Sequence, residues 1–163
     1  MALLDDMGIA YTLYHHRPVF TADEAAFLRD EIPGCHVKNL FVRDKKERMA
    51  LLVVPDELSL DLKAVAPAIG LDRLSFGSPE RLWDNLGVRP GSVCPYSVMN
   101  DTACAVKLVL HKGVADADIV IAHPMINTMS IAVASFGLLR FLESTGHSPL
   151  IIDLNRYARC TAA

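Results

Sequence analysis

One lysine stands out in the segment 36–41 because the predicted strand around it is otherwise largely apolar. The segment reads His36-Val-Lys38-Asn39-Leu-Phe41. Alternation along a strand places Lys38 on one face with apolar residues and Asn39 on the other. Burying an unpaired ammonium group is costly, so Lys38 offers a point charge for an anion such as phosphate. The structural alternative is a lysine at a strand end whose head group reaches solvent.

Two further segments place polar groups on predicted loops, where ligands are commonly held. Residues 91–96 combine a glycine, which permits close approach of the backbone to a ligand, with a hydroxyl group. Residues 123–128 bring an imidazole, an amide and a hydroxyl together after a predicted strand. Taken alone, the first segment is more typical of an ordinary Gly/Pro turn, and a lone histidine is as often structural as catalytic.

The turn after the lysine strand carries the basic patch of the chain. Between residues 38 and 48, five Lys and Arg residues face two acidic residues, Asp44 and Glu47. Three of these basic residues, Lys45, Lys46 and Arg48, lie in the turn itself. They indicate either a small surface for phosphates or a solvated hairpin tip.

Several familiar catalytic patterns are absent from the sequence. It contains no G-x-S-x-G, P-loop, G-x-G-x-x-G or H-E-x-x-H motif, so lipase-like, NTPase, dinucleotide and zincin functions lose support. Cys35 and His36 are adjacent, but neighbours on a strand point to opposite faces, which argues against a nucleophilic pair. The four cysteines are scattered without a C-x-x-C, so neither a zinc site nor a disulfide framework is indicated. The residues themselves point to a small-ligand or phosphate-binding α/β domain.

The elements that must position these residues alternate in type. Thr21 and Glu24 stand at capping-box spacing, Asp61 and Ser78 are N-cap candidates, and 37–43 with 49–54 forms a predicted hairpin. Strands are predicted over Tyr11–His15, 37–43, 49–54, 105–110, Ile119–Ala122, 128–134 and Leu150–Ile152, and helices over 3–7, from 21, 61–70, 78–86 and 136–145. This order favours an α/β (α+β) fold with a mixed, mostly antiparallel sheet or partial barrel packed with helices.

Length and composition bound the class of protein. The chain has 163 residues, 52% of them hydrophobic, which fits one domain over residues 1–163 with a core that needs no metal or disulfide. A net charge of −3 excludes a strongly basic nucleic-acid coat. Charges, Pro and Gly interrupt every apolar run before the roughly 18 residues of a membrane helix, so we expect a cytoplasmic protein that binds neither membrane nor DNA.

The segments 36–46, 74–82, 86–93, Asn100-Asp101 and 123–128 occur in the order and spacing of a known family. The sequence resembles the YbaK/ProX family of aminoacyl-tRNA deacylases, related to the editing domain of bacterial prolyl-tRNA synthetases. The similarity runs from about Tyr11 to Asp153 and is greatest to the free-standing alanyl branch, ProXp-ala or PrdX.

The resemblance implies a trans-editing hydrolase that removes alanine wrongly attached to the tRNA for proline. A synthetase pocket shaped for proline rejects alanine weakly, because each missing methylene is worth only about 1–3 kcal/mol. The family is expected to use no metal or organic cofactor. Its expected partners are the acceptor end of the tRNA and prolyl-tRNA synthetase.

The resemblance also assigns roles to residues. Lys38 would hold a phosphate near the terminal adenosine, backbone N–H groups near Gly91 would polarise the ester carbonyl, and water would be the nucleophile. The expected catalytic residues are Lys38, Asn39, Gly91, Ser92, His123 and Asn127; the expected substrate-binding residues are Thr128, Cys94, Tyr96 and Ser130; and the expected tRNA-binding residues are Lys45, Lys46, Arg48 and Arg81.

Four positions depart from the family pattern. Cys94 and Tyr96 stand where Thr and Phe are more usual, Ser130 replaces a common Thr, and Pro67 lies in a helix usually free of proline. Because the first three would border the pocket, two alternatives stay open beside the alanyl enzyme: a Cys-tRNA deacylase of the same family and a non-catalytic module that binds tRNA or a synthetase.

Overall fold

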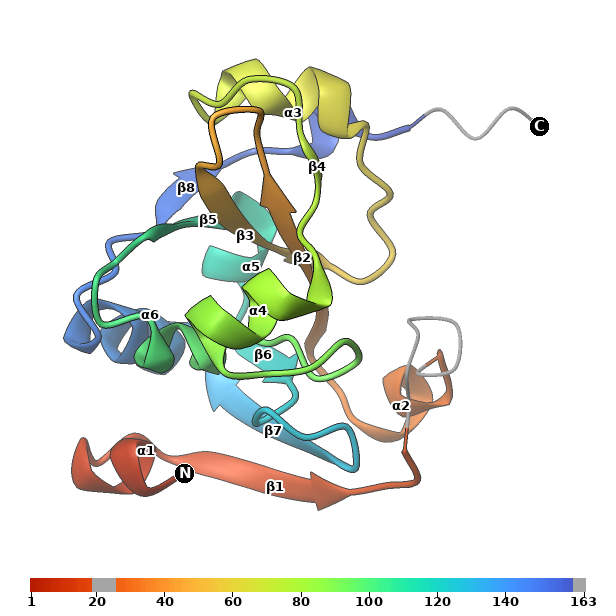
Figure 1. Ribbon diagram of the computed structural model, residues 1–163. Coiled ribbons are helices and arrows are strands. Elements are labelled where there is room, and N and C mark those ends of the chain that lie inside the picture. Colours follow the sequence, from red (N-terminus) through yellow and green to blue (C-terminus); the bar gives the residue numbers. More distant parts are fainter. Residues whose placement is uncertain (19–25, 160–163) are drawn as a thin grey trace.

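A computed structural model describes residues 1–18 and 26–159, and its centre is a mixed β-sheet (Figure 1). The strand order is β1-β7-β6-β2-β3-β5-β8, and β4 pairs separately with β2. Pairing is parallel for β2 with β6, β3 with β5 and β5 with β8, and antiparallel elsewhere. The strands are β1 Tyr11–His15, β2 Cys35–Arg43, β3 Met49–Pro55, β4 Ser75–Phe76, β5 Val106–His111, β6 Ile119–Ala122, β7 Met129–Ala134 and β8 Leu150–Ile152.

Helices cover both faces of this sheet, which confirms the predicted α+β class with a mixed sheet. They are α1 Ala2–Asp6, α2 Ala26–Glu31, α3 Leu62–Ala68, α4 Pro79–Leu86, α5 Lys112–Ala115 and α6 Ser135–Ser144, with 3-10 helices η1 Pro95–Asn100 and η2 Asn155–Tyr157. One core joins the sheet to α4, η1 and α6. A second core lies under α3 on the other face, and a small cluster joins α2 to β6.

Local sequence signals explain where several elements begin. The Asp61 carboxylate accepts the backbone N–H of Lys63 at the start of α3, and the Ser78 hydroxyl accepts that of Arg81 at the start of α4. Pro67 lies inside α3, one residue before the last. The predicted capping box at Thr21 and Glu24 lies outside the described residues.

The hairpin of β2 and β3 is the scaffold for the candidate site. Its predicted antiparallel register is confirmed, with Lys38 opposite Val54 and Arg43 opposite Met49. Every residue of β3 between its two ends is buried, whereas the first six residues of β2 are only half-buried. Lys38 therefore lies in the more accessible half of a central strand, and its head group costs less to accommodate than full burial would require.

Within the described residues, no helix is long and apolar enough to cross a membrane.

Candidate active site

Strands β2 and β6 bring Lys38 and His123 to the same level of the sheet. The two strands run parallel, with His36 opposite Ile121. Lys38 and His123 each lie two residues beyond this pair, and His123 directly follows the end of β6. The fold thus places the lysine and the histidine singled out in the sequence on neighbouring strands.

Asn39 occupies the opposite face of β2 and fixes the loop between α4 and η1. Its side-chain Nδ2 donates a hydrogen bond to the carbonyl oxygen of Val93, 3.1 Å away. Within the described residues its Oδ1 is buried and has no hydrogen-bond partner. A buried acceptor left unsatisfied is costly, so this oxygen is a candidate to receive an N–H group from a ligand.

The loop that Asn39 holds contains Gly91 and Ser92. Gly91 has φ +88°, a conformation that favours glycine, and the N–H of Ser92 donates to the carbonyl of Arg89, 3.0 Å away. Ser92 N–H is therefore occupied by its own turn. In the part of the chain that the structure describes, the N–H of Gly91 has no intramolecular acceptor, which leaves it as the better candidate oxyanion donor.

Histidines that the sequence analysis did not group surround His123. The His16 and His123 rings lie 5.6 Å apart between centroids, and His16 Nε2 is 3.0 Å from the Ser130 hydroxyl. Burial, together with the nearby His16 and His36, lowers the pKa of His123 to about 4. His123 is therefore neutral near pH 7, able to donate or accept a hydrogen bond through the two nitrogens of its ring.

This pKa shift predicts a pH-dependent stability. The unfolded chain binds a proton at position 123 near pH 6.5, but the folded chain does so only near pH 4, so protons favour unfolding between these values. The contribution of His123 to the free energy of unfolding is complete above pH 6.5 and is lost as the pH falls toward 4. Denaturant unfolding at a series of pH values between 7.5 and 4 measures this. The free energy of unfolding should fall less steeply with decreasing pH in His123→Gln than in the natural chain.

The exposed His15 provides the control for this measurement. His15→Gln should keep the pH dependence of the natural chain. An identical slope in the His123→Gln variant and the natural chain would contradict the assignment.

The remaining members of the 123–130 segment contribute through backbone and packing. The Thr128 carbonyl accepts the N–H of His16 at 3.0 Å, so its main contact is not made by its hydroxyl. Asn127 is half-buried and Ser130 is buried. Met125 has φ +65° and packs against the core that contains Cys94, which connects this loop to the one that contains Gly91.

Cys94 and Tyr96 are buried in the main core. Burial raises the pKa of the Cys94 thiol to about 11, with hydrogen bonds from backbone groups acting in the opposite direction. Burial also raises the pKa of Tyr96, whose ring packs edge-on against Phe141 at 5.2 Å. Cys94 is thus an inert thiol of the core.

A small apolar cavity lies beneath the turn that follows His123. Its volume is about 20 Å³, room for about one water molecule. Tyr96, Pro124, Met125, Ile131 and Phe141 line it together with residues from the amino-terminal end of the chain.

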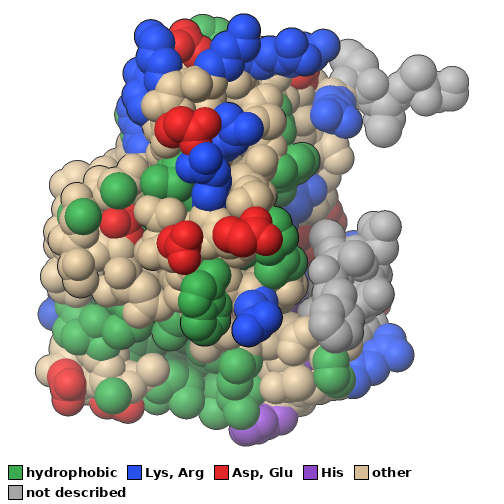
Figure 2. Space-filling model, in the orientation of Figure 1, with side chains coloured by type: hydrophobic (Ala, Val, Ile, Leu, Met, Phe, Trp, Pro, Cys, Tyr) green, Lys and Arg blue, Asp and Glu red, His purple; other side chains and the backbone are tan. Residues whose placement is uncertain are grey.

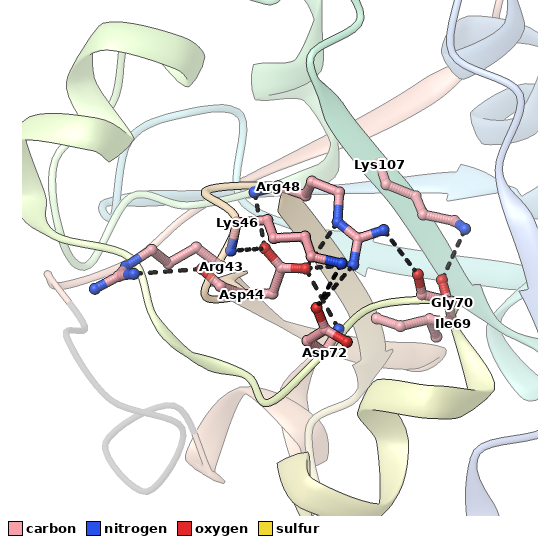
Figure 3. Close-up of polar contacts among 8 residues, drawn as sticks. All are labelled: Arg43, Asp44, Lys46, Arg48, Ile69, Gly70, Asp72 and Lys107. Atoms are coloured by element: carbon pink, nitrogen blue, oxygen red, sulfur yellow. Dashed lines mark hydrogen bonds and ion pairs between the residues drawn. The ribbon is translucent and has the colours of Figure 1, made fainter.

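The predicted tRNA-binding residues lie at the other end of β2 and do not join this site. Lys38 and Asp44 are six residues apart, about 20 Å along an extended strand. Around the turn, Lys46 pairs with Asp72 at 3.3 Å, Arg48 with Asp44 at 2.6 Å, and Arg81 with Glu47. Figure 3 shows Lys46 and Arg48 directed at Asp44 and Asp72. Within the described residues Lys45 alone among the four has no ion pair, so much of the positive charge is offset.

Among residues 1–18 and 26–159, no three His, Cys, Asp or Glu side chains are grouped as metal ligands.

Comparison with known sequences identifies the class of protein to which this mixed sheet with its polar loops belongs. Residues 16–141 match the family described as the aminoacyl-tRNA editing domain. The chain belongs to this family, whose members hydrolyse the ester bond of mischarged aminoacyl-tRNA, and it is an aminoacyl-tRNA deacylase.

Two curated relatives and two solved structures show the range of similarity. "Prolyl-tRNA editing protein ProX" of Acetoanaerobium sticklandii is 36% identical over 155 residues, which cover 94% of both chains. "Prolyl-tRNA synthetase associated domain-containing protein 1" of Danio rerio is 32% identical over 154 residues, covering 93% of this chain and 84% of the relative.

The structural neighbours share the fold at lower sequence identity. The "hypothetical protein APE2540" aligns with TM-score 0.72 and 18% identity over 94% of this chain and 96% of the other. A candidate trans-editing enzyme for prolyl tRNA synthetase aligns with TM-score 0.65 and 21% identity over 88% and 85%.

Proposed function

We propose that this deacylase removes alanine from mischarged tRNA for proline. The choice of tRNA is supported by the relative named as a prolyl-tRNA editing protein, which matches over nearly its whole length. The choice of amino acid is supported by the apolar cavity of about 20 Å³ lined by Tyr96, Pro124 and Met125, which we propose as the pocket for the side chain of the substrate. A methyl group fits such a space, whereas a pyrrolidine ring does not.

The proposed mechanism uses positioning and electrostatic stabilisation. Lys38 holds a phosphate near the terminal adenosine, and the free N–H of Gly91 stabilises negative charge on the ester carbonyl. Asn39, held by Val93, accepts a hydrogen bond from the amino group of the substrate at its unsatisfied Oδ1. An aminoacyl ester is already reactive, so placing water beside its carbonyl supplies much of the acceleration.

In this proposal neutral His123 orients the attacking water, and Asn127 of the same loop assists it. A new bond forms between the water oxygen and the carbonyl carbon, and the bond from that carbon to the ribose oxygen breaks. One proton of the water passes to the ribose oxygen, which leaves as a hydroxyl group. The products are free alanine and uncharged tRNA.

Four charged tRNAs offered to one protein preparation test this proposal. We expect Ala-tRNA for proline to be hydrolysed about 100-fold faster than Pro-tRNA, because discrimination of this size is attainable when the larger side chain cannot enter. The release of labelled amino acid from Ala-, Cys-, Ser- and Pro-charged tRNA measures it. If cysteine were released faster than alanine, the protein would be a Cys-tRNA deacylase. If no amino acid were released from any of the four tRNAs, it would be a non-catalytic binding module.

A further inference from the structure

An open groove of about 350 Å³ lies between α4 and the loop that follows it. Pro79, Glu80, Trp83 and Asp84 of α4 line it, together with Arg89 and Pro90 of the loop. Helix α4 lies at the front of the molecule in Figure 1, and over it in Figure 2 acidic, basic and hydrophobic side chains lie side by side. The groove is therefore a mixed surface rather than a purely apolar one.

A flat aromatic surface forms the apolar part of this groove. The Trp83 side chain is 54% exposed, and the Arg89 guanidinium carbon lies 5.3 Å from its ring centroid. This distance is within the range of a cation–π contact, so Arg89 holds the indole while much of the indole remains accessible. An exposed aromatic ring beside an arginine can stack a nucleobase, and such stacking tolerates any base sequence.

The charges around the indole favour a base rather than a phosphate. Glu80 and Asp84 contribute two carboxylates against one guanidinium, an arrangement that repels a phosphate. Carboxylates accept hydrogen bonds from exocyclic amino groups, as in the pairing of Glu or Asp with N4 of cytosine. The groove therefore suits a planar ring that carries an amino group.

A short stretch of backbone links the groove to the loop of the candidate active site. Pro90 precedes Gly91, and Val93 is bound by Asn39. Val93 lies three positions after Pro90, a span of at most about 11 Å. The unpaired 3′ end of tRNA has the sequence C-C-A, so an ester bound at Gly91 places the preceding cytosines near the groove.

We propose that Trp83 and Arg89 form a stacking platform for a cytosine of the unpaired C-C-A end, with the cytosine amino group hydrogen-bonded to Glu80 or Asp84. The proposal rests on the proposed function, because it assumes that the acceptor end reaches Gly91. It adds an affinity for the acceptor end that does not depend on the offset charges of the β2–β3 turn.

Tryptophan fluorescence tests the platform directly, because Trp83 is the chain's one tryptophan. An RNA stem-loop that ends in unpaired C-C-A and carries no amino acid should quench the emission of the natural chain in a saturable titration. The same stem-loop without its C-C-A end should quench much less. Because this RNA carries no amino acid, the result does not depend on deacylation.

Variants supply the second measurement. Binding of the labelled C-C-A stem-loop, followed by fluorescence anisotropy, should weaken about 5- to 150-fold in Trp83→Ala, and Trp83→Phe should retain most of the affinity. The control is Phe136→Ala on α6, because Phe136 is an aromatic residue even more exposed than Trp83, 67% accessible. This variant should bind as the natural chain does.

Two outcomes would overturn the platform. In the first, Trp83→Ala binds the stem-loop as tightly as the natural chain. In the second, RNA leaves the fluorescence unchanged but added prolyl-tRNA synthetase shifts it, which would make the groove a protein surface. Failure of the proposed function would appear differently, as absent hydrolysis of Ala-tRNA with normal quenching.

Discussion

Lys38→Ala is expected to lower kcat/KM for Ala-tRNA deacylation about 100- to 1,000-fold, the usual cost of removing one preorganised electrostatic contact. In the proposed mechanism the ammonium group holds the substrate beside His123, because Lys38 and His123 lie at the same level of the neighbouring strands β2 and β6. Single-turnover hydrolysis of Ala-tRNA measures the effect. The thermal unfolding midpoint should stay close to that of the natural chain, because Lys38 is only half-buried.

Two variants separate the role of this position from general charge effects. Lys63 on α3 is an exposed lysine that has no role in the proposed mechanism, and Lys63→Ala should keep full activity. Lys38→Arg keeps the charge but changes the shape of the head group, so it should recover part of the loss. Full turnover in Lys38→Ala would remove Lys38 from the mechanism.

Asp101→Ala is expected to lower the free energy of unfolding by about 3–5 kcal/mol, the typical cost of removing one partner of a buried pair. The Asp101 carboxylate accepts the backbone N–H groups of Ala105 and Val106 and lies 3.2 Å from His147 Nε2. Both side chains of the pair are almost fully buried. The substitution leaves the two N–H groups at the start of β5 and the His147 ring without their acceptor.

Urea unfolding at neutral pH measures this loss. Asp118, which is exposed on the loop before β6, provides the matched control, and Asp118→Ala should change the free energy of unfolding by no more than about 0.5 kcal/mol. A change below about 1 kcal/mol in Asp101→Ala would show that the carboxylate is dispensable. The motif Asn100-Asp101 would then need another explanation.

The local part of the fold could be predicted from the sequence. The hairpin, the caps at Asp61 and Ser78, and the strands Tyr11–His15 and Ile119–Ala122 depend on neighbouring residues alone. The short elements could not be predicted: β4 has two residues, and α5 begins after His111, whose ring nitrogen accepts the N–H of Gly113. Segments this short show no hydrophobic period.

The candidate site was predictable only where one residue contradicted its surroundings. Lys38 contrasts with the apolar residues around it, and His123 belongs to a loop that also carries an amide and a hydroxyl. The contact between His16 and Ser130 depends on the pairing of β1 with β7, in which Tyr14 lies opposite Ser130. The pairing of two strands so distant in the chain cannot be predicted from the residues around either of them. Asp72 reaches the basic turn in the same way, from a distant segment.

The order of the strands also bears on synthesis of the protein. His16 follows the first strand, Gly91 comes from the middle of the chain, and His123 and Ser130 lie on either side of the last loop of the site. Domains emerge from the ribosome amino-terminal end first, and among the described strands β1 pairs with β7 alone. A nascent chain therefore lacks a complete candidate site until residue 134, the end of β7, has left the exit tunnel.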